Sequence, residues 1–220
     1  MKISLTAAAV VCLAALGAMG TLESAKSGSD FGHRSDPEAC LNAKDKSADD
    51  LIVACWKALN SHMMNRNGVA FALNNLAVAY REKGDWDSAL NALNAAIKIQ
   101  GDTWQALLNR GGVYTRLEKP DLALADFNRA IELNSDQPVC FRMRGEYYLN
   151  REKYDLAIAD FTRAVLLDPK DAKALFLRAS AKERSGDPSG AAADLALAKQ
   201  IDPDVENGNG ISHSKAAVPW

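Results

Sequence analysis

The chain repeats itself with a period of 34 residues. The clearest match pairs the segment LALADFNRAIELN at 122–134 with LAIADFTRAVLLD at 156–168. The same period extends over four units that start at residues 70, 104, 138 and 172, without an insertion or deletion. A repeat of this length is one supersecondary unit, and such a unit cannot bury its apolar face alone. The sequence therefore predicts a stack of similar units with a continuous core.

Small and large residues occur in the same order within each unit. Small residues recur in three registers, which are Ala77, Gly111, Gly145 and Ala179; Ala89, Ala123, Ala157 and Ala191; and Ala96, Ala130, Ala164 and Ala198. Two further registers have large side chains, at Leu93, Phe127, Phe161 and Leu195 and at Tyr80, Tyr114, Tyr148 and Lys182. This order of small, aromatic and small positions resembles the tetratricopeptide repeat, which has the same period.

The resemblance covers residues 70–205. It implies an all-α fold, an α-solenoid of antiparallel helix hairpins, with one repeat in each of the segments 70–103, 104–137, 138–171 and 172–205. The sequence departs from the family pattern in three ways. Leu or Phe replaces the family's Trp in every unit, Lys182 replaces the last Tyr, and the closing Pro is present only as Pro169 and Pro203. None of these changes removes a small residue from the contact between helices.

The local sequence chemistry agrees with helix hairpins. Each unit has two stretches of apolar residues at helical spacing, and turn-forming residues separate them at 83–85, 119–121, 150–155 and 185–188. Asp87, Asp121 and Asp155 share one position near the start of the second helix, where a carboxylate can accept unpaired backbone N–H groups and complement the helix dipole. Gly or Ala at the crossing allows the two helices to approach closely.

The segments outside the four units have different compositions. Residues 1–20 combine Lys2, an uncharged apolar run at 3–16 and a small-x-small ending at 18–20, which predicts a cleaved signal peptide and a periplasmic or secreted protein. An uncleaved membrane anchor is the alternative, although the run is shorter than the ~20 residues of a spanning helix. Residues 21–36 predict a flexible leader, and residues 206–220 a disordered tail. Residues 37–65 predict a degenerate repeat that caps the stack, with an irregular connection at 62–68.

Composition and residue placement exclude several classes of function. The 26 Lys and Arg residues are balanced by 28 Asp and Glu residues, so neither nucleic acid nor an acidic membrane surface is a favoured partner. The three histidines, His33, His62 and His213, lie outside the repeats, so no imidazole can activate a nucleophile there. Gly111 and Gly112 follow no strand, as a phosphate-binding loop would require. We expect no enzymatic activity, no metal and no cofactor.

Two cysteines fall on the two proposed helices of the N-terminal cap. Cys40 and Cys55 are flanked by apolar residues and lie close to the intervening turn. In an exported chain they favour a disulfide, which would stabilise the cap by about 2–4 kcal/mol. Two separate buried thiols are the alternative. Cys140, on a first helix, is expected to be a buried free thiol, since its natural partners are used.

The family resemblance also implies a binding surface. In tetratricopeptide repeats the first helices line a concave groove, to which the second, fifth, ninth and twelfth positions of each unit point. Carried over to this chain, it indicates a groove for an extended or helical peptide. The partner-binding residues expected there are Phe71, Asn74, Val78, Arg81, Gln105, Leu108, Asn109, Thr115, Arg142, Glu146, Lys173 and Phe176. For Val78 and Leu108, packing between repeats is the alternative.

The groove lacks one ligand-binding arrangement that the family uses. A clamp for C-terminal carboxylates requires Lys at the fifth position and Asn at the ninth position of one repeat. No unit combines the two, and Asn109 and Lys173 are isolated matches. We therefore do not predict recognition of chaperone tails.

Two classes of function remain. The first is a non-enzymatic adaptor that holds an unidentified protein or peptide in the concave groove. The second is a structural, homo-oligomeric repeat protein: residues 203–220 have no helical period, so the last apolar face, with Leu195 and Leu197, would be open to a second copy. A size measurement separates the two.

Arg and Asp recur together in three of the four units. The seventh position has Arg110, Arg144 and Arg178, and the twenty-third has Asp126, Asp160 and Asp194. The first unit has Leu76 and Ala92 at these positions, so the two charges are present together and absent together. Because the two positions face each other across a hairpin, we predict an ion pair within each of the three units. A ladder of arginines that binds anions is the alternative.

Overall fold

The computed structural model describes residues 37–42 and 46–207, and all regular secondary structure in these residues is helical. The helices are α2 (Pro37–Leu41), α3 (Ala48–Asn60), α4 (Arg66–Glu82), α5 (Trp86–Gln100), α6 (Trp104–Arg116), α7 (Pro120–Leu133), α8 (Pro138–Leu149), α9 (Tyr154–Leu167), α10 (Ala172–Ser185), α11 (Pro188–Ile201) and the 3-10 helix η2 (Val205–Asn207). The expected all-α fold is confirmed. The predicted signal peptide, leader and most of the tail lie outside the described residues.

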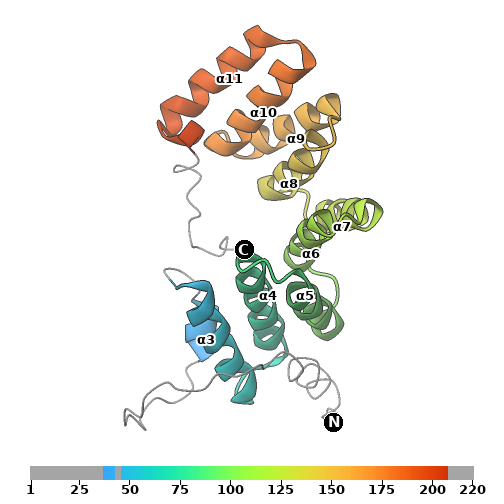
Figure 1. The fold of residues 1–220 in the computed structure, drawn as a ribbon, viewed down its shortest axis with the longest axis vertical. Helices are drawn as coiled ribbons and strands as arrows, with labels where there is room; N and C mark the ends of the chain where they lie inside the picture. Colours follow the sequence, from blue (N-terminus) through green and yellow to red (C-terminus); the bar gives the residue numbers. More distant parts are fainter. Residues whose placement is uncertain (1–36, 43–45, 208–220) are drawn as a thin grey trace.

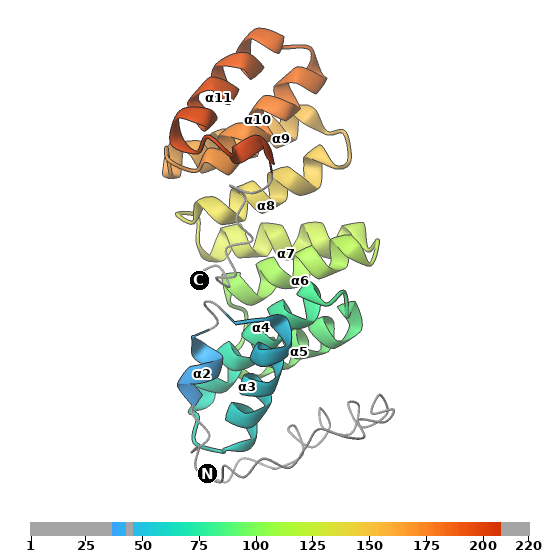
Figure 2. The ribbon, with the colours of Figure 1, turned by 60° about the vertical axis from the view of Figure 1, so that its left-hand side comes forward.

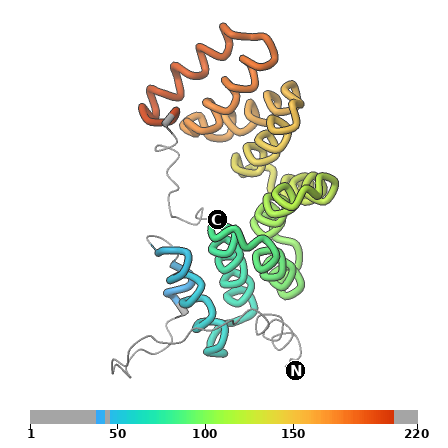
Figure 3. Tube along the Cα trace, viewed as in Figure 1, coloured from blue at the N-terminus to red at the C-terminus, as the bar shows by residue number. Residues whose placement is uncertain are grey.

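The helices pair into antiparallel hairpins that stack into a curved array (Figure 1). Seen from the side, the hairpins follow one another from α2 and α3 at one end to α10 and α11 at the other (Figure 2). The trace of the chain forms an arc, with α4, α6, α8 and α10 along its inner side (Figure 3). These first helices also contact one another in sequence, α4 with α6, α6 with α8 and α8 with α10. The expected solenoid is therefore present, and the first helices form its inner surface.

The hairpin crossing depends on the size of two facing residues. In the second and third units Gly111 and Gly145 face Phe127 and Phe161, and a Cβ atom built on either glycine would lie 2.7 Å from a ring carbon. Such a contact is too short for any side chain. The first and last units have Ala and Leu at the same two positions instead. Each crossing thus combines either the smallest residue with a ring or Ala with Leu.

Helix starts depend on capping side chains that differ from the predicted ones. Asn65 accepts a hydrogen bond from the N–H of Gly68 at 2.8 Å, so α4 starts at Arg66 and the expected connection at 62–68 is shorter. Asp85 and Asp187 cap α5 and α11. The predicted capping bonds of the carboxylates at 87, 121 and 155 are absent from the described structure. Those three lie in the first turn, where their charge complements the helix dipole.

The last unit differs from the others on its outer face. In the first three units, apolar residues at the twenty-first and twenty-eighth positions of the unit lie on the second helix and pack against the next unit. Leu124 and Ile131 of α7 are an example. The last unit has the exposed Ala192 and Lys199 there, and Lys199 forms a 2.8 Å ion pair with Glu206. Val205 of η2 is buried beside α10. The prediction that a disordered tail begins at residue 206 is therefore wrong at 206 and 207, which belong to this 3-10 turn.

Candidate functional site

The inner surface has both exposed and buried members among the predicted binding residues. Phe71 is exposed, whereas Asn74, Val78, Leu108 and Asn109 are buried. The second interpretation of Val78 and Leu108, packing between repeats, agrees with their burial. The expectation that Asn74 is exposed is wrong: its side chain is buried and accepts a hydrogen bond from Asn109 of α6.

The buried side chains of Asn74 and Asn109 are hydrogen-bonded to each other. The Nδ2 group of Asn109 donates to Oδ1 of Asn74 at 3.0 Å, and Oδ1 of Asn109 accepts a hydrogen bond from Nη1 of Arg81 at 3.3 Å. A buried amide is stable when its polar atoms have partners. The three side chains therefore form a chain of hydrogen bonds between the first and second units. Arg81 is partly buried at the end of this chain.

A cavity of about 330 Å³ lies beside Asn74. It includes three of the predicted residues, Phe71, Asn74 and Gln105. The rest of its wall comes from α2, α4, α5, α6 and the turn before α6, and consists of Leu41, Asn67, Gly68, Ala70, Ala96, Gln100, Thr103 and Ala106. An apolar wall with a few amides suits an apolar side chain on a peptide whose backbone needs hydrogen-bond partners.

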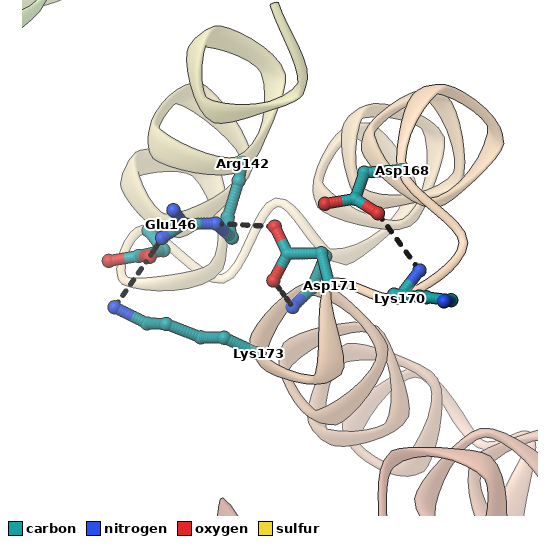
Figure 4. Close-up of polar contacts among 7 residues, drawn as sticks. Arg142, Glu146, Asp168, Lys170, Asp171 and Lys173 are labelled. Carbon is teal, nitrogen blue, oxygen red and sulfur yellow. Dashed lines mark hydrogen bonds and ion pairs between the residues drawn. The ribbon is translucent and has the colours of Figure 1, made fainter. Parts of the chain in front are cut away.

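The predicted charged residues of the third and fourth units form one network (Figure 4). Nε of Arg142 donates to Asp171 at 2.9 Å, and Nη1 of Arg142 donates to Glu146 at 3.3 Å. Nζ of Lys173 also lies 3.1 Å from Glu146. Asp171 in addition caps α10 by accepting from the N–H of Ala174. The network contains two positive and two negative side chains, so its own net charge is zero.

The two remaining predicted residues have structural contacts of their own. Thr115 donates a hydrogen bond to the carbonyl of Gly111 at 2.9 Å, and it lines a second cavity of about 360 Å³ with Tyr147 and Arg151. Phe176 packs against the apolar cluster that contains Val205. The structure thus brings Phe71, Asn74, Gln105, Asn109 and Arg81 together near the N-terminal end of the inner surface and separates them from Phe176.

The three predicted ion pairs within the repeats are confirmed. Arg110, Arg144 and Arg178 each donate two hydrogen bonds to the Asp of the same unit, with donor–acceptor distances of 2.7–2.9 Å. The structure adds a contact that the sequence analysis missed. Nη1 of each Arg also donates to the second helix of the preceding unit, where the acceptors are Asn94, Asn128 and Thr162. These acceptors share the twenty-fifth position of their units, and that register is the signal that would have revealed them.

The cysteines are arranged as predicted. Cys40 of α2 and Cys55 of α3 form a disulfide with an S–S distance of 2.12 Å, and Cys140 is free and buried. Burial raises the pKa of the Cys140 thiol to about 12, so this thiol stays protonated at neutral pH. The disulfide joins the two helices of the cap, and Nδ2 of Asn75 donates to the carbonyl of Cys40 at 2.9 Å. The disulfide therefore holds the two helices of the cap together, and the hydrogen bond from Asn75 connects the cap to α4.

The described residues contain no group of three or more His, Cys, Asp or Glu side chains that could hold a metal ion. Among the same residues, no helix has the length and apolar character needed to span a membrane.

Comparison with protein families gives two matches, both to models described as tetratricopeptide repeat, at residues 74–138 and 145–209. The chain belongs to the tetratricopeptide repeat family. The two matches lie within the four predicted units except at the C-terminal edge. A comparison with curated proteins finds no match.

Solved structures of other tetratricopeptide repeat proteins have a similar fold. A crystal structure of MamA is 20% identical, covers 73% of this chain and 91% of its own, and has a TM-score of 0.58. MamA 41-end from Desulfovibrio magneticus RS-1 is 17% identical, with coverage of 76% and 92% and a TM-score of 0.60. YrrB, described as a tetratricopeptide repeat protein with an unusual peptide-binding site, is 22% identical, with coverage of 78% and 88% and a TM-score of 0.56.

The structure also explains one departure from the tetratricopeptide pattern. In the second and third units the guanidinium of the seventh-position Arg lies over the ring of the pattern's Tyr, at 5.7 Å for Tyr114 and 5.9 Å for Tyr148. In the last unit Lys182 takes this place, and its Nζ lies 2.8 Å from Asp194, which also binds Arg178. The substitution thus replaces a ring contact with a second ion pair.

Proposed function

We propose that this tetratricopeptide repeat protein is a non-enzymatic interaction module that holds a segment of a partner protein on its inner surface. The observation that carries the proposal is the cavity between α4 and α6, where apolar side chains and the amides of Asn74 and Gln105 lie together. The description of YrrB as having a peptide-binding site supports the same use of this fold. In this role the repeats supply shape and hydrogen-bond partners, and no chemistry.

We also propose that the protein acts in the periplasm or outside the cell, after removal of the N-terminal signal peptide. The disulfide between Cys40 and Cys55 supports this location, because disulfides persist in oxidising compartments. The partner would then be an exported protein or peptide.

Site-specific photo-crosslinking tests the proposed binding surface. A photoreactive residue at Gln105, inside the cavity, should crosslink a protein from the same compartment. The matched control has the same residue at Leu122, which is exposed on the second helix α7 of the same unit. A crosslink from position 105 and none from position 122 supports binding on the inner surface. The reverse result would place the binding surface on the second helices.

A further inference from the structure

Arg81 differs from the other arginines that point along the inner surface and the hairpin crossings. Arg110, Arg142, Arg144 and Arg178 all form ion pairs with carboxylates. Within the described part of the chain, Arg81 forms no ion pair, and its one hydrogen bond goes to the neutral amide of Asn109. The positive charge of Arg81 is thus partly buried without a negative partner.

The surroundings of Arg81 leave room for a partner. Gly112 of α6 lies beside it: a Cβ atom on this glycine would be 3.9 Å from Nη1 of Arg81 and 3.5 Å from Met143. Gly112 has no side chain, so the space on that side of Arg81 is bordered by the methyl group of Met143. Among the described residues, one fully buried side-chain polar atom has no hydrogen bond, and it is Oδ1 of Asn75. The unbonded nitrogens of Arg81 are therefore not fully buried and keep contact with solvent. A ligand can therefore reach them.

The position of the guanidinium is set by the buried amides. Asn74 holds Asn109 by a 3.0 Å hydrogen bond, and Asn109 accepts from Arg81. A long side chain that is already oriented loses less conformational entropy when it binds a ligand. Burial lowers the pKa of Arg81, against the opposing influence of the carboxylates Glu82 and Glu146, so its surroundings disfavour the charged form. A carboxylate from outside would reverse that effect.

The cavity and Arg81 lie on the same helix at a spacing that suits a peptide. Asn74, in the wall of the cavity, and Arg81 are seven residues apart on α4, which corresponds to about 10 Å along the helix. An extended peptide advances about 3.3 Å per residue, so about three residues cover this distance. The Nδ2 group of Asn74 forms no hydrogen bond among the described residues and can donate to a backbone carbonyl on the way.

From these contacts we propose that the inner surface recognises an extended peptide with an apolar residue in the cavity and an acidic side chain, three positions away, on Arg81. This proposal rests on the proposed function and adds the chemistry of the partner. A carboxylate suits this position because a guanidinium can donate two N–H bonds to it, and only Nη1 of Arg81 is bonded to Asn109.

Two blocked tetrapeptides test this inference on the full-length protein. Acetyl-Leu-Ala-Ala-Glu-amide and the matched Gln peptide differ only in the negative charge. Nuclear magnetic resonance titration follows the Nε–Hε signal of Arg81 together with the amide signals of Gln105 and Asn74. The Glu peptide should bind at least tenfold more tightly than the Gln peptide and should shift the Arg81 signal. In Arg81→Gln the two peptides should bind equally.

Arg116→Gln is the matched control. Arg116 is exposed near the end of α6, as Arg81 is near the end of α4, so its removal changes the net charge equally. This variant should keep the tenfold preference. A preference that survives in Arg81→Gln would overturn the inference. An Arg81 signal that the Glu peptide leaves unchanged in the wild type would also overturn it, and that result does not require any variant to fold.

The outcomes also separate this inference from the proposed function. If both peptides shift the cavity signals with equal affinity, the charge recognition fails and peptide binding on the inner surface stands. If neither peptide binds at millimolar concentration, the inference fails, and crosslinking from position 105 decides the proposed function independently.

Discussion

At the scale of single residues, the four repeats contain their own substitution experiment. Ala77 with Leu93 and Gly145 with Phe161 occupy the same hairpin crossing in different units. Ala77, Leu93 and Phe161 are buried, and Gly145 faces the ring of Phe161. The total volume at the crossing is conserved, whereas its division between the two helices is not. Close-packed interiors require this compensation.

Gly145→Ala should destabilise the protein although Ala is the better helix former. Alanine contributes up to about 1 kcal/mol through helix propensity. Its Cβ atom, however, would lie 2.7 Å from the buried ring of Phe161, and overpacking of this kind costs about 1–3 kcal/mol. We expect a net loss of about 1–2 kcal/mol in the free energy of unfolding, measured by urea denaturation.

The double variant Gly145→Ala with Phe161→Leu is the control for this prediction. It reproduces the pair found in the first unit, so it should recover most of the stability that Gly145→Ala loses. If the double variant is less stable than the sum of the two single changes, the compensation argument is wrong.

Asp194 should make the last unit sensitive to acid. Burial alone would raise the pKa of this carboxyl, but hydrogen bonds from Arg178 and Lys182 lower it below its ordinary value. A carboxylate with a depressed pKa stabilises the folded state above its unfolded pKa of about 3.9, and this contribution disappears as the pH falls through the folded value. The difference in unfolding free energy between the wild type and Asp194→Asn should therefore be constant above pH 5.5 and shrink below pH 4.

Lys182→Tyr is the matched variant for the acid titration. It restores the residue of the other three units and removes one of the two cations that bind Asp194. Because the folded pKa of Asp194 then lies closer to its unfolded value, the total loss of stability with falling pH should be smaller than in the wild type. An identical pH profile in the two proteins would show that Lys182 does not lower this pKa.

At the scale of helices, the repeat period was sufficient to predict the hairpins and the ion pairs between their two helices. A period of 34 residues places equivalent residues in equivalent surroundings, so recurrence alone revealed Arg144 opposite Asp160. The exposure of Asn74 was predicted wrongly for a related reason. The family positions say which helix face a residue occupies, and they do not say how far the preceding and following helices cover that face.

The bond between units at Arg144 should be weaker than the ion pair within the unit. Asn128→Ala removes the 2.7 Å bond between units and should cost about 1 kcal/mol. Arg144→Met leaves the buried carboxylate of Asp160 without its partner and should cost about 3 kcal/mol or more. Chemical denaturation measures both changes, and a double-mutant cycle on Arg144 and Asp160 should give a coupling energy well above 1 kcal/mol. Absence of coupling would contradict the assignment.

At the scale of the whole molecule, the two ends of the stack are closed in different ways. The N-terminal end has a short hairpin with the disulfide between Cys40 and Cys55. The C-terminal end has small and charged residues at the positions that elsewhere bind the next unit, together with the buried Val205. The first closure was predicted from the degenerate repeat at 37–65, on whose two helices Cys40 and Cys55 lie. The closure of the C-terminal end was not predicted. Ala192 and Lys199 lie at the twenty-first and twenty-eighth positions of the unit, which are not among the registers used to recognise the repeat.

This polar end argues against assembly of copies through the last unit. Leu197 and Ile201 remain exposed on α11, but a docking unit would have to bury Lys199 and break its ion pair with Glu206. Burying a charge without its partner costs several kcal/mol.

Ala192→Ile with Lys199→Val gives α11 the apolar pair that Ile158 and Val165 provide in the preceding unit. We expect light scattering after size-exclusion chromatography to show a larger, concentration-dependent mass for this double variant than for the wild type. Ala192→Ser with Lys199→Arg, which keeps the end small and charged, should leave the wild-type mass unchanged. If the wild type itself self-associates and Leu197→Glu abolishes that association, the end is an interface between copies despite Lys199.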